Sequence, residues 1–223
     1  MRDRTLQFCA SMTLLAVLAG APFAGAQTVD MLQLHKVRAE SVEYQGKRAV
    51  HLTEAQANTG EDTFAIVSGS QFQDGTIDIE VSGAPAHGAI EGARGFIGVA
   101  FRVQPEAAKF ELLYLRPTNG RADDQLRRNH STQYVSFPDW PWQRTRQETP
   151  GLYESYVDLQ PGVWTKVRIV VNGTKAGLYV NGAEQPCLVV NDLKLGLVKG
   201  AIALWIGPGT DGYFANLHLT PQK

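Results

Sequence analysis

The chain has 223 residues and an almost even charge balance, with 21 lysines and arginines against 22 acidic residues and a formal net charge of −1. A near-neutral chain lacks the basic surface that nucleic-acid-binding domains need, so we expect no nucleic-acid partner. After residue 26 no stretch is apolar enough to span a membrane. Cys187 is then the only cysteine left, so no internal disulfide can form there.

Residues 1–26 have the pattern of a secretory signal peptide. Two arginines form a short basic start, an apolar run extends from Phe8 to Leu18, and Ala24-Gly25-Ala26 supplies the small residues of a cleavage site. The apolar run is too short to cross about 30 Å of hydrocarbon, which favours cleavage over an uncleaved anchor. We therefore expect a secreted or periplasmic protein in which residues 27–223 form a single domain.

Alternation of polar and apolar residues is the main periodic signal in residues 27–223. Residues 76–81 alternate strictly, and residues 164–171 have one largely apolar face, as in strands that cover a core with one face. Residues 96–101 are apolar on both faces, which is typical of a central strand. Residues 110–115 and 201–206 form two similar apolar runs, and we expect a strand at each. The pattern predicts an all-β domain.

The turns agree with this prediction. Asn172-Gly173 lies between two apolar runs, and Asn181-Gly182 follows the second run. Asn-Gly favours a tight hairpin because both residues tolerate a positive φ. We expect eleven to thirteen short strands, spaced as in a sandwich or barrel. The sequence shows no long helical pattern, and residues 106–109 are expected to form one helical turn.

The segment from Pro117 to Glu154 interrupts the rhythm of strands. It is polar, rich in arginine and aromatic residues, and shows little alternation. A stretch of this length without regular structure is usually either functional or disordered. Disordered segments contain few aromatic residues, whereas this one holds several. We therefore predict one long polar and aromatic insertion that lies over one mouth or face of the sandwich.

Several strand and turn motifs resemble concanavalin A-like lectin/glucanase and laminin G-like domains. They are residues 72–78, 163–169, 177–182, 200–207 and 213–217, in which Trp164 opens one strand and Tyr179-Val180-Asn181-Gly182 closes the next. The resemblance runs from about Thr63 to Leu219 and also extends to bacterial secreted 3-keto-disaccharide hydrolase-type domains. It implies a jelly-roll β-sandwich. It does not choose a function, since this fold is found in lectins, glucanases, sugar lyases and protein-binding modules.

Residues 76–80 test the likeness to one class of glucanase. Laminarinase-type members of the superfamily carry Glu-x-Asp-x-Glu on one strand, which aligns three carboxylates on one face. Asp78 and Glu80 match the second and third positions, but Thr76 occupies the place of the nucleophile. We interpret this strand face as solvated and not as catalytic.

The segment 117–154 carries the candidate binding residues. Trp140 and Trp142 are stiffened by neighbouring prolines and can stack on sugar rings, although clamping the loop to the sandwich is the alternative. Planar and polar side chains in and beside the same segment can donate hydrogen bonds to hydroxyl groups. The predicted substrate-binding residues are Arg116, Asn119, Arg121, Gln125, Arg128, His130, Tyr134, Trp140 and Trp142.

If the protein cleaves sugars, we expect the acid or base among carboxylates near this loop. Asp124 and Glu154 are the candidates, because Asp124 has an acidic neighbour and Glu154 lies between tyrosines on a short alternating stretch. The histidines show no zinc spacing. Calcium binding is possible through oxygens of Asn191, Asp192 and Asp211, but no calcium-binding motif is present, so we predict no metal or cofactor.

Three functions remain open. The first is a secreted carbohydrate-binding domain with a cleft roofed by residues 117–154. The second is a glycoside hydrolase that acts through carboxylates of that cleft. The third is a laminin G-like adhesion or structural module. The sequence favours a poly- or oligosaccharide as the partner, because the missing glutamate at Thr76 disfavours glucanase chemistry and the polar-aromatic segment suits sugar binding.

Overall fold

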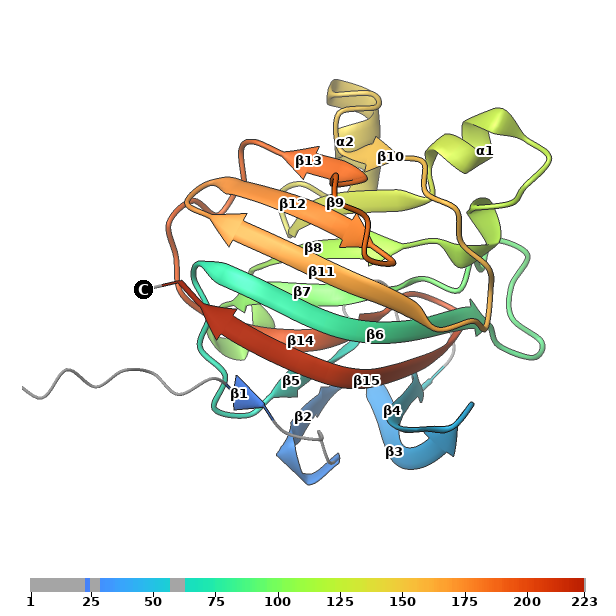
Figure 1. Cartoon of the computed structure of the whole chain (residues 1–223), viewed down its shortest axis with the longest axis horizontal. Coiled ribbons are helices and arrows are strands. Elements are labelled where there is room, and N and C mark those ends of the chain that lie inside the picture. Colours follow the sequence, from blue (N-terminus) through green and yellow to red (C-terminus); the bar gives the residue numbers. More distant parts are fainter. Residues whose placement is uncertain (1–22, 25–28, 57–62, 223) are drawn as a thin grey trace, which may run out of the picture.

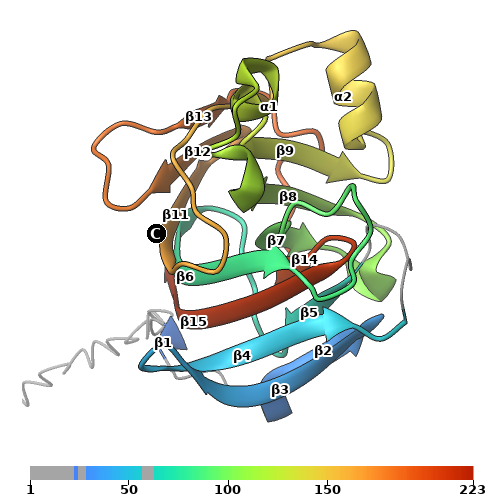
Figure 2. The same ribbon diagram turned by 90° about the vertical axis from the view of Figure 1, so that its right-hand side faces the viewer.

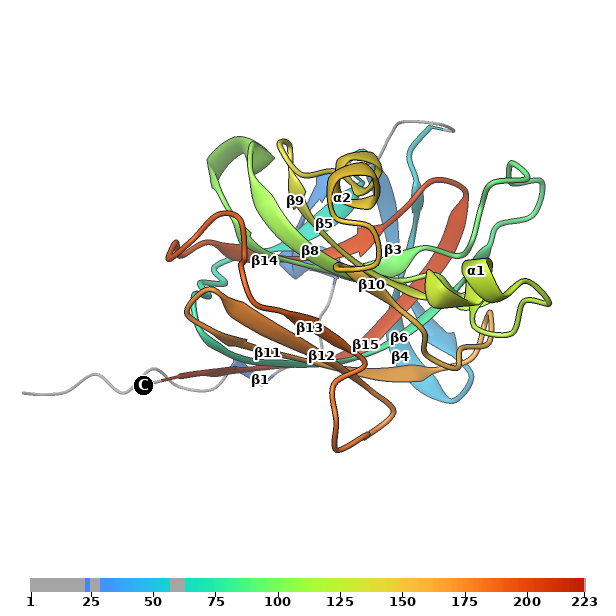
Figure 3. The same ribbon diagram turned by 90° about the horizontal axis from the view of Figure 1, so that it is seen from above.

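Two antiparallel β-sheets face each other across an apolar core (Figures 1 and 3). The computed structural model describes residues 23–24, 29–56 and 63–222. The predicted signal peptide, residues 1–26, lies outside this part of the chain except for the two residues of strand β1. The predicted all-β jelly-roll sandwich is confirmed.

Sheet A is the front layer of the sandwich in Figure 1. In spatial order its strands are β13 (Leu188–Val190), β12 (Lys175–Val180), β11 (Thr165–Asn172), β6 (Gly75–Pro85), β15 (Thr210–Pro221), β4 (Lys47–Glu54) and β3 (Val37–Tyr44), with β1 (Phe23–Ala24) also paired to β15. All of these pairings are antiparallel.

Sheet B is the second layer. In spatial order its strands are β10 (Glu154–Ser155), β9 (Thr132–Phe137), β8 (Phe110–Leu115), β7 (Ile97–Val103), β14 (Ala201–Ile206), β5 (Phe64–Val67) and β2 (Leu32–His35). The helical segments are η1 (Val29–Met31), η2 (Pro105–Ala107), η3 (Pro117–Asn119), α1 (Gln125–Asn129) and α2 (Trp142–Glu148). Figure 2 shows α1 and α2 at the same end of the sandwich, beside β9.

The alternating strands behave as the sequence predicts. In β6 the side chains of Ile77 and Ile79 are buried between the sheets, whereas Asp78 and Glu80 are half-buried on the outer face. Strand β11 pairs with β6 in register, so Ile169 lies opposite Ile77 and extends the same apolar face. Burying such side chains contributes roughly 1.5–3 kcal/mol each, which fixes the register of the two strands.

Sheet B, in contrast, is buried on both faces. All seven residues of β7 are buried, as expected for the central strand predicted at residues 96–101. One face of the sheet packs on sheet A. The other carries a second apolar cluster, which contains Phe64, Ala100, Val103, Phe110, Leu112, Tyr114, Val135, Ala203 and Trp205. The outer face of sheet B is therefore apolar, whereas the outer face of sheet A is polar.

The predicted turns are also found. Strands β11 and β12 form a hairpin in which Asn172 pairs with Lys175 and Gly173 has a φ of 61°. Asn181 and Gly182 both adopt positive φ where β12 ends. The predicted helical turn at residues 106–109 is the short η2, which begins at Pro105. No helix among the described residues is long and apolar enough to span a membrane.

The segment 117–154 is not one insertion, and this part of the prediction was wrong. Its middle forms β9, which pairs with β8 along its whole length and has five of its six residues buried. The sequence pattern did not predict this strand because Thr132, Gln133 and Ser136 are polar although they are buried. Hydrogen bonds to protein partners make their burial possible, for example from Thr132 Oγ1 to the carbonyl of Ser155 at 3.1 Å.

Candidate functional site

A pocket of about 530 Å³ opens on the outer face of sheet B, beside α1 and α2. Its floor is formed by Leu112 and Tyr114 of β8, Val135 of β9 and Trp205 of β14. These side chains point outward because they alternate with residues of the inter-sheet core. The volume lies within the range of about 300–1,000 Å³ that is common for small-molecule sites.

The floor depends on a close approach between two strands. A Cβ atom on Gly98 would lie 2.5 Å from the Cβ of Tyr114, which only glycine avoids. The Tyr114 ring can therefore lie over β7 and meet the ring of Trp205, with 4.8 Å between the ring centroids. The two rings are inclined to each other by 45° and form an aromatic floor from strands that are distant in sequence.

Three segments form the walls of the pocket. Helix α2 contributes Trp142 and Arg146, and the guanidinium of Arg146 lies 4.9 Å from the Trp142 ring centroid. Helix α1 contributes Leu126 and Arg127, and His130 follows directly after its end. The loop before β7 contributes Arg94, and the N–H of Thr118 donates to the carbonyl of Arg94 at 3.3 Å. The walls therefore combine apolar surface with several arginines.

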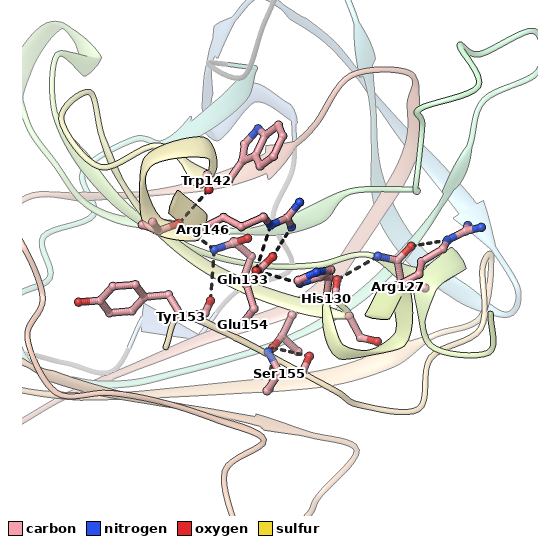
Figure 4. Close-up of polar contacts among 12 residues, drawn as sticks. Arg127, His130, Gln133, Trp142, Arg146, Tyr153, Glu154 and Ser155 are labelled. Carbon is pink, nitrogen blue, oxygen red and sulfur yellow. Dashed lines mark hydrogen bonds and ion pairs between the residues drawn. The ribbon is translucent and has the colours of Figure 1, made fainter. Parts of the chain in front are cut away.

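A buried carboxylate lies behind the pocket (Figure 4). The Glu154 side chain is only 3% exposed, and Nη1 of Arg116 donates to its Oε1 at 3.2 Å. Arg146 donates to both carboxylate oxygens, at 3.2 Å from Nε to Oε2. His130 Nδ1 lies 2.8 Å from Oε2, within ion-pair distance, although the contact is not aligned as a hydrogen bond. Glu154 thus holds two arginines and one histidine together.

Arg116 is fixed by further contacts. Its Nη2 donates to the hydroxyl of Tyr114 at 2.8 Å and to Oε1 of Gln133 at 2.9 Å, while Nη1 also donates to the carbonyl of His130 at 3.1 Å. The Arg116 side chain is 6% exposed. A guanidinium held in this way is preorganised, so a ligand that meets it orders little further structure.

The pKa of His130 is lowered from its ordinary value of 6.5. The largest cause is burial, and the positive charges of Arg146 and Arg116 act in the same direction, while Glu154 opposes them. His130 is therefore neutral near pH 7. A neutral imidazole can donate one hydrogen bond and accept another, which suits contact with a hydroxyl group.

The pocket brings together five of the predicted site residues, although they are spread over 27 positions of the sequence. They are Arg116, Asn119, Asp124, His130 and Trp142. Asp124 has a structural task as well, since its Oδ1 accepts the N–H of Arg127 at 2.7 Å and caps α1. Glu154 lines a smaller neighbouring depression together with His130 and Arg146.

The remaining predicted binding residues lie elsewhere. Arg121 is exposed and pairs with Asp158 at 2.8 Å. Gln125 donates to Asn129 at 2.7 Å, and Arg128 donates to the hydroxyl of Tyr156 at 2.9 Å. None of these three residues lines the pocket.

Two predicted aromatic contacts are occupied within the protein. The Trp140 ring lies between Arg144 and Lys194, at 3.9 and 4.1 Å from its centroid. Tyr134 is fully buried between the sheets, where its hydroxyl donates to Oε2 of Glu111 at 2.7 Å. Tyr134 therefore cannot meet a ligand in the pocket.

Sequence reasoning missed several residues that line the pocket. These are chiefly Arg94, Phe96, Tyr114, Arg127, Phe137, Arg146 and Trp205. A signal was available for Tyr114, which alternates with Leu112 and Arg116 along a single strand. None was available for Arg94, because its position depends on a loop that reaches the pocket only in the folded chain.

Other carboxylates considered from the sequence serve the fold. On the outer face of sheet A, Asp78 pairs with Arg168 at 2.7 Å, and Glu80 pairs with Lys47. Both carboxylates are therefore engaged in ion pairs on this face.

Of the residues suggested for calcium, Asp192 accepts hydrogen bonds from Tyr153 at 2.7 Å and Lys194 at 2.6 Å, and Asp211 pairs with His51. In the part of the chain that the structure describes, no three His, Cys, Asp or Glu residues gather as a metal site.

Comparison with known proteins identifies the fold. No family model matches the chain, and no curated protein matches it in sequence. The carbohydrate binding module CBM66 from Bacillus subtilis is similar in structure, with a TM-score of 0.58 and 12% identity over 85% of this chain and 96% of that chain. The fold is that of the concanavalin A-like lectins and glucanases. This confirms the fold that the resemblance in the sequence implies.

Two further solved structures support the same assignment. A protein with a galectin-like fold from Bacillus subtilis has a TM-score of 0.53 and 11% identity, over 89% of this chain and 97% of that one. A protein described as a glycosidic hydrolase also has a TM-score of 0.53, at 10% identity over 93% and 99% of the two chains. At these identities the similarity concerns the fold.

Proposed function

We propose that this protein is an exported carbohydrate-binding domain that holds a saccharide in the pocket on the outer face of sheet B. The observation that carries the proposal is the pairing of an aromatic floor and wall with rigidly held hydrogen-bond donors. Trp142 and the floor supply apolar surface, and Arg116, Asn119 and His130 supply polar groups at its edge. The C–H faces of a sugar ring can pack on the apolar surface, and its hydroxyl groups can form hydrogen bonds with the polar groups.

The state of the two candidate carboxylates favours binding over carboxylate-driven hydrolysis. A general acid needs a proton that it can release to the substrate near neutral pH. Glu154 is buried, and both of its carboxylate oxygens are already engaged by Arg116 and Arg146. Asp124 is the N-cap of α1. Neither group is free to serve as an acid at the pocket floor.

The likeness to CBM66 agrees with a binding role, since that protein is itself described as a carbohydrate-binding module. A solvent-exposed pocket on one sheet face also suits a chain-like ligand that extends past the rim. We expect the domain to act outside the cytoplasm, in the periplasm or the medium, because residues 1–26 have the pattern of a signal peptide. Sequencing the N-terminus of the exported protein would test this, with residue 27 expected first.

Isothermal titration calorimetry against a saccharide panel tests the binding proposal. We expect one or more oligosaccharides to bind the full chain and Trp142→Ala to weaken that binding at least tenfold. Trp164→Ala is the matched control, because Trp164 packs against Tyr44 of sheet A, whereas the pocket lies on sheet B. Binding that is unaffected by Trp142→Ala, or the absence of binding to every saccharide, would contradict the proposal.

One observation favours sugar cleavage as a second candidate. His130 lines the pocket, and the carboxylate of Glu154 lies 2.8 Å behind its ring. A carboxylate beside a neutral imidazole is an arrangement found in general-base catalysis. Release of reducing sugar from the same panel would support this candidate if His130→Gln abolished it. Release that His130→Gln leaves unchanged would exclude His130 as the base.

A further inference from the structure

The charge of the pocket exceeds what a neutral sugar requires. Among the described residues that line it, Asp124 alone carries a carboxylate, and this group is committed to the start of α1. Four lining residues carry a permanent positive charge, and they approach from four different segments of the chain. These are Arg94, Arg116, Arg127 and Arg146.

Two of these arginines share one counter-charge. The buried carboxylate of Glu154 pairs with both Arg116 and Arg146, so one negative charge offsets part of their two positive charges. The two arginines approach Glu154 from the end of β8 and from α2, and they are fixed by it. They shape the pocket wall, and each already has an ionic partner within the protein.

Arg94 and Arg127 are not neutralised in this way. Arg94 Nη1 donates to the carbonyls of Glu91 and Ala93, at 2.6 and 3.0 Å. Arg127 donates to neutral oxygens of Asn119 and Thr118, at 2.9 and 3.0 Å. Neither guanidinium forms an ion pair with any residue that the structure describes. Both are half-buried at the pocket.

The two unpaired guanidinium groups influence each other. Burial is the main cause that lowers the pKa of Arg94, and the charges of Arg127 and Arg116 lower it further, while Glu91 opposes them. Like charges that line one pocket repel, and an anion bound in that pocket would relieve the repulsion. Partial burial strengthens this attraction because water screens it less.

We propose that the saccharide bound here is acidic, and that Arg94 and Arg127 together hold the carboxylate of a uronic acid unit. This inference rests on the proposed function and specifies its ligand. A carboxylate is planar and presents two oxygens, which match the forked donors of a guanidinium. The sugar ring attached to it then lies on the aromatic floor, with Trp142 at its side.

Matched pairs of oligosaccharides test the proposal. Oligomers of galacturonic, glucuronic and mannuronic acid are titrated into the full chain by calorimetry, each beside its carboxyl methyl ester. The ester keeps the sugar and the linkage and removes only the charge. We expect one acid form to bind at least about tenfold more tightly than its ester. Added salt should weaken binding of the acid and leave that of the ester nearly unchanged.

Variants assign the effect to the two arginines. Arg94→Gln and Arg127→Gln should each remove most of the preference for the acid, whereas Arg94→Lys, which keeps the charge, should retain part of it. Arg168→Gln is the control, since Arg168 pairs with Asp78 on the outer face of sheet A. Circular dichroism of each variant confirms that a loss of preference does not reflect unfolding.

The possible outcomes separate the two proposals. If neutral saccharides bind and esters bind as tightly as acids, the acidic ligand is overturned while carbohydrate binding stands. If a sulfated oligosaccharide binds more tightly than every uronate, the carboxylate assignment is overturned. If no saccharide of any charge binds, both proposals fail. A preference for the acid that survives both glutamine variants would overturn the role of Arg94 and Arg127.

Discussion

Arg116 and Glu154 form a buried ion pair, with Nη1 and Oε1 3.2 Å apart and both side chains at most 6% exposed. The pair joins the end of β8 to β10 and so ties the pocket floor to the segment that follows α2. A buried pair of this kind stabilises chiefly through the cost of breaking it, since a lone buried charge is very unfavourable. The geometry of the pocket therefore depends on a residue that does not line it.

We predict that Glu154→Gln lowers the free energy of unfolding by roughly 3 kcal/mol, because it leaves Arg116 buried without a counter-charge. Urea denaturation followed by circular dichroism measures this. Glu148→Gln is the control, since its pair with Arg144 is exposed and contributes only about 0.5 kcal/mol. Equal stability of the wild type and the Glu154 variant would show that the pair does not hold this corner of the fold.

Tyr134→Phe should separate stability from binding. The Tyr134 hydroxyl donates to Glu111 at 2.7 Å and accepts the N–H of Lys194 at 2.9 Å, so its removal leaves buried groups without partners. We expect a loss of about 1–3 kcal/mol in unfolding free energy and no change in saccharide affinity. A weaker affinity at unchanged stability would instead place Tyr134 at the ligand.

Stability should fall as the pH is lowered through about 6.5, in part because of His130. Its pKa in the folded protein is lowered, so near pH 6 the unfolded chain binds a proton that the folded chain does not. Stability then rises with pH across this window. Chemical denaturation at pH 7.5 and pH 5.5 should show a smaller difference for His130→Gln than for the wild type. An identical difference in both proteins would contradict the burial of His130.

Cys187 should react slowly with thiol reagents while the protein is folded. Burial raises the pKa of its thiol to about 11, and its Sγ donates to the carbonyl of Leu178 at 3.3 Å. At pH 8 the thiolate fraction is then on the order of 100-fold below that of a free cysteine. Iodoacetamide labelling, followed by mass spectrometry of the peptide with residue 187, should be fast only in urea. Rapid labelling of the native protein would contradict the burial of the Cys187 thiol.

The sequence predicts most of the fold because alternation records which side of a strand is buried. Strands β6 and β11 show this directly, with Ile77 and Ile169 facing the core and Asp78 and Arg168 facing water. The same rule failed for β9. There Gln133 is buried, and its amide oxygen accepts a hydrogen bond from Arg116. A polar residue therefore occupies a buried position where alternation predicts an apolar one.

The candidate site was only partly predictable for a related reason. Arg116, His130 and Trp142 fall in one unusual segment, which drew attention to them. Arg94 lies more than twenty residues earlier, in a loop that reaches the pocket through the hydrogen bond from the Thr118 N–H to its carbonyl. Such contacts between distant segments leave no local pattern in the sequence.

The central claim is that a saccharide occupies the pocket on the outer face of sheet B. The most direct measurement is a two-dimensional amide NMR titration of the full chain with the saccharide that binds most tightly in calorimetry. We predict that the amides that shift cluster at residues 90–96, 112–116, 124–130 and 142–146, on a single face of the molecule. Shifts that cluster on the outer face of sheet A, or that leave these four segments unchanged at saturation, would contradict the claim.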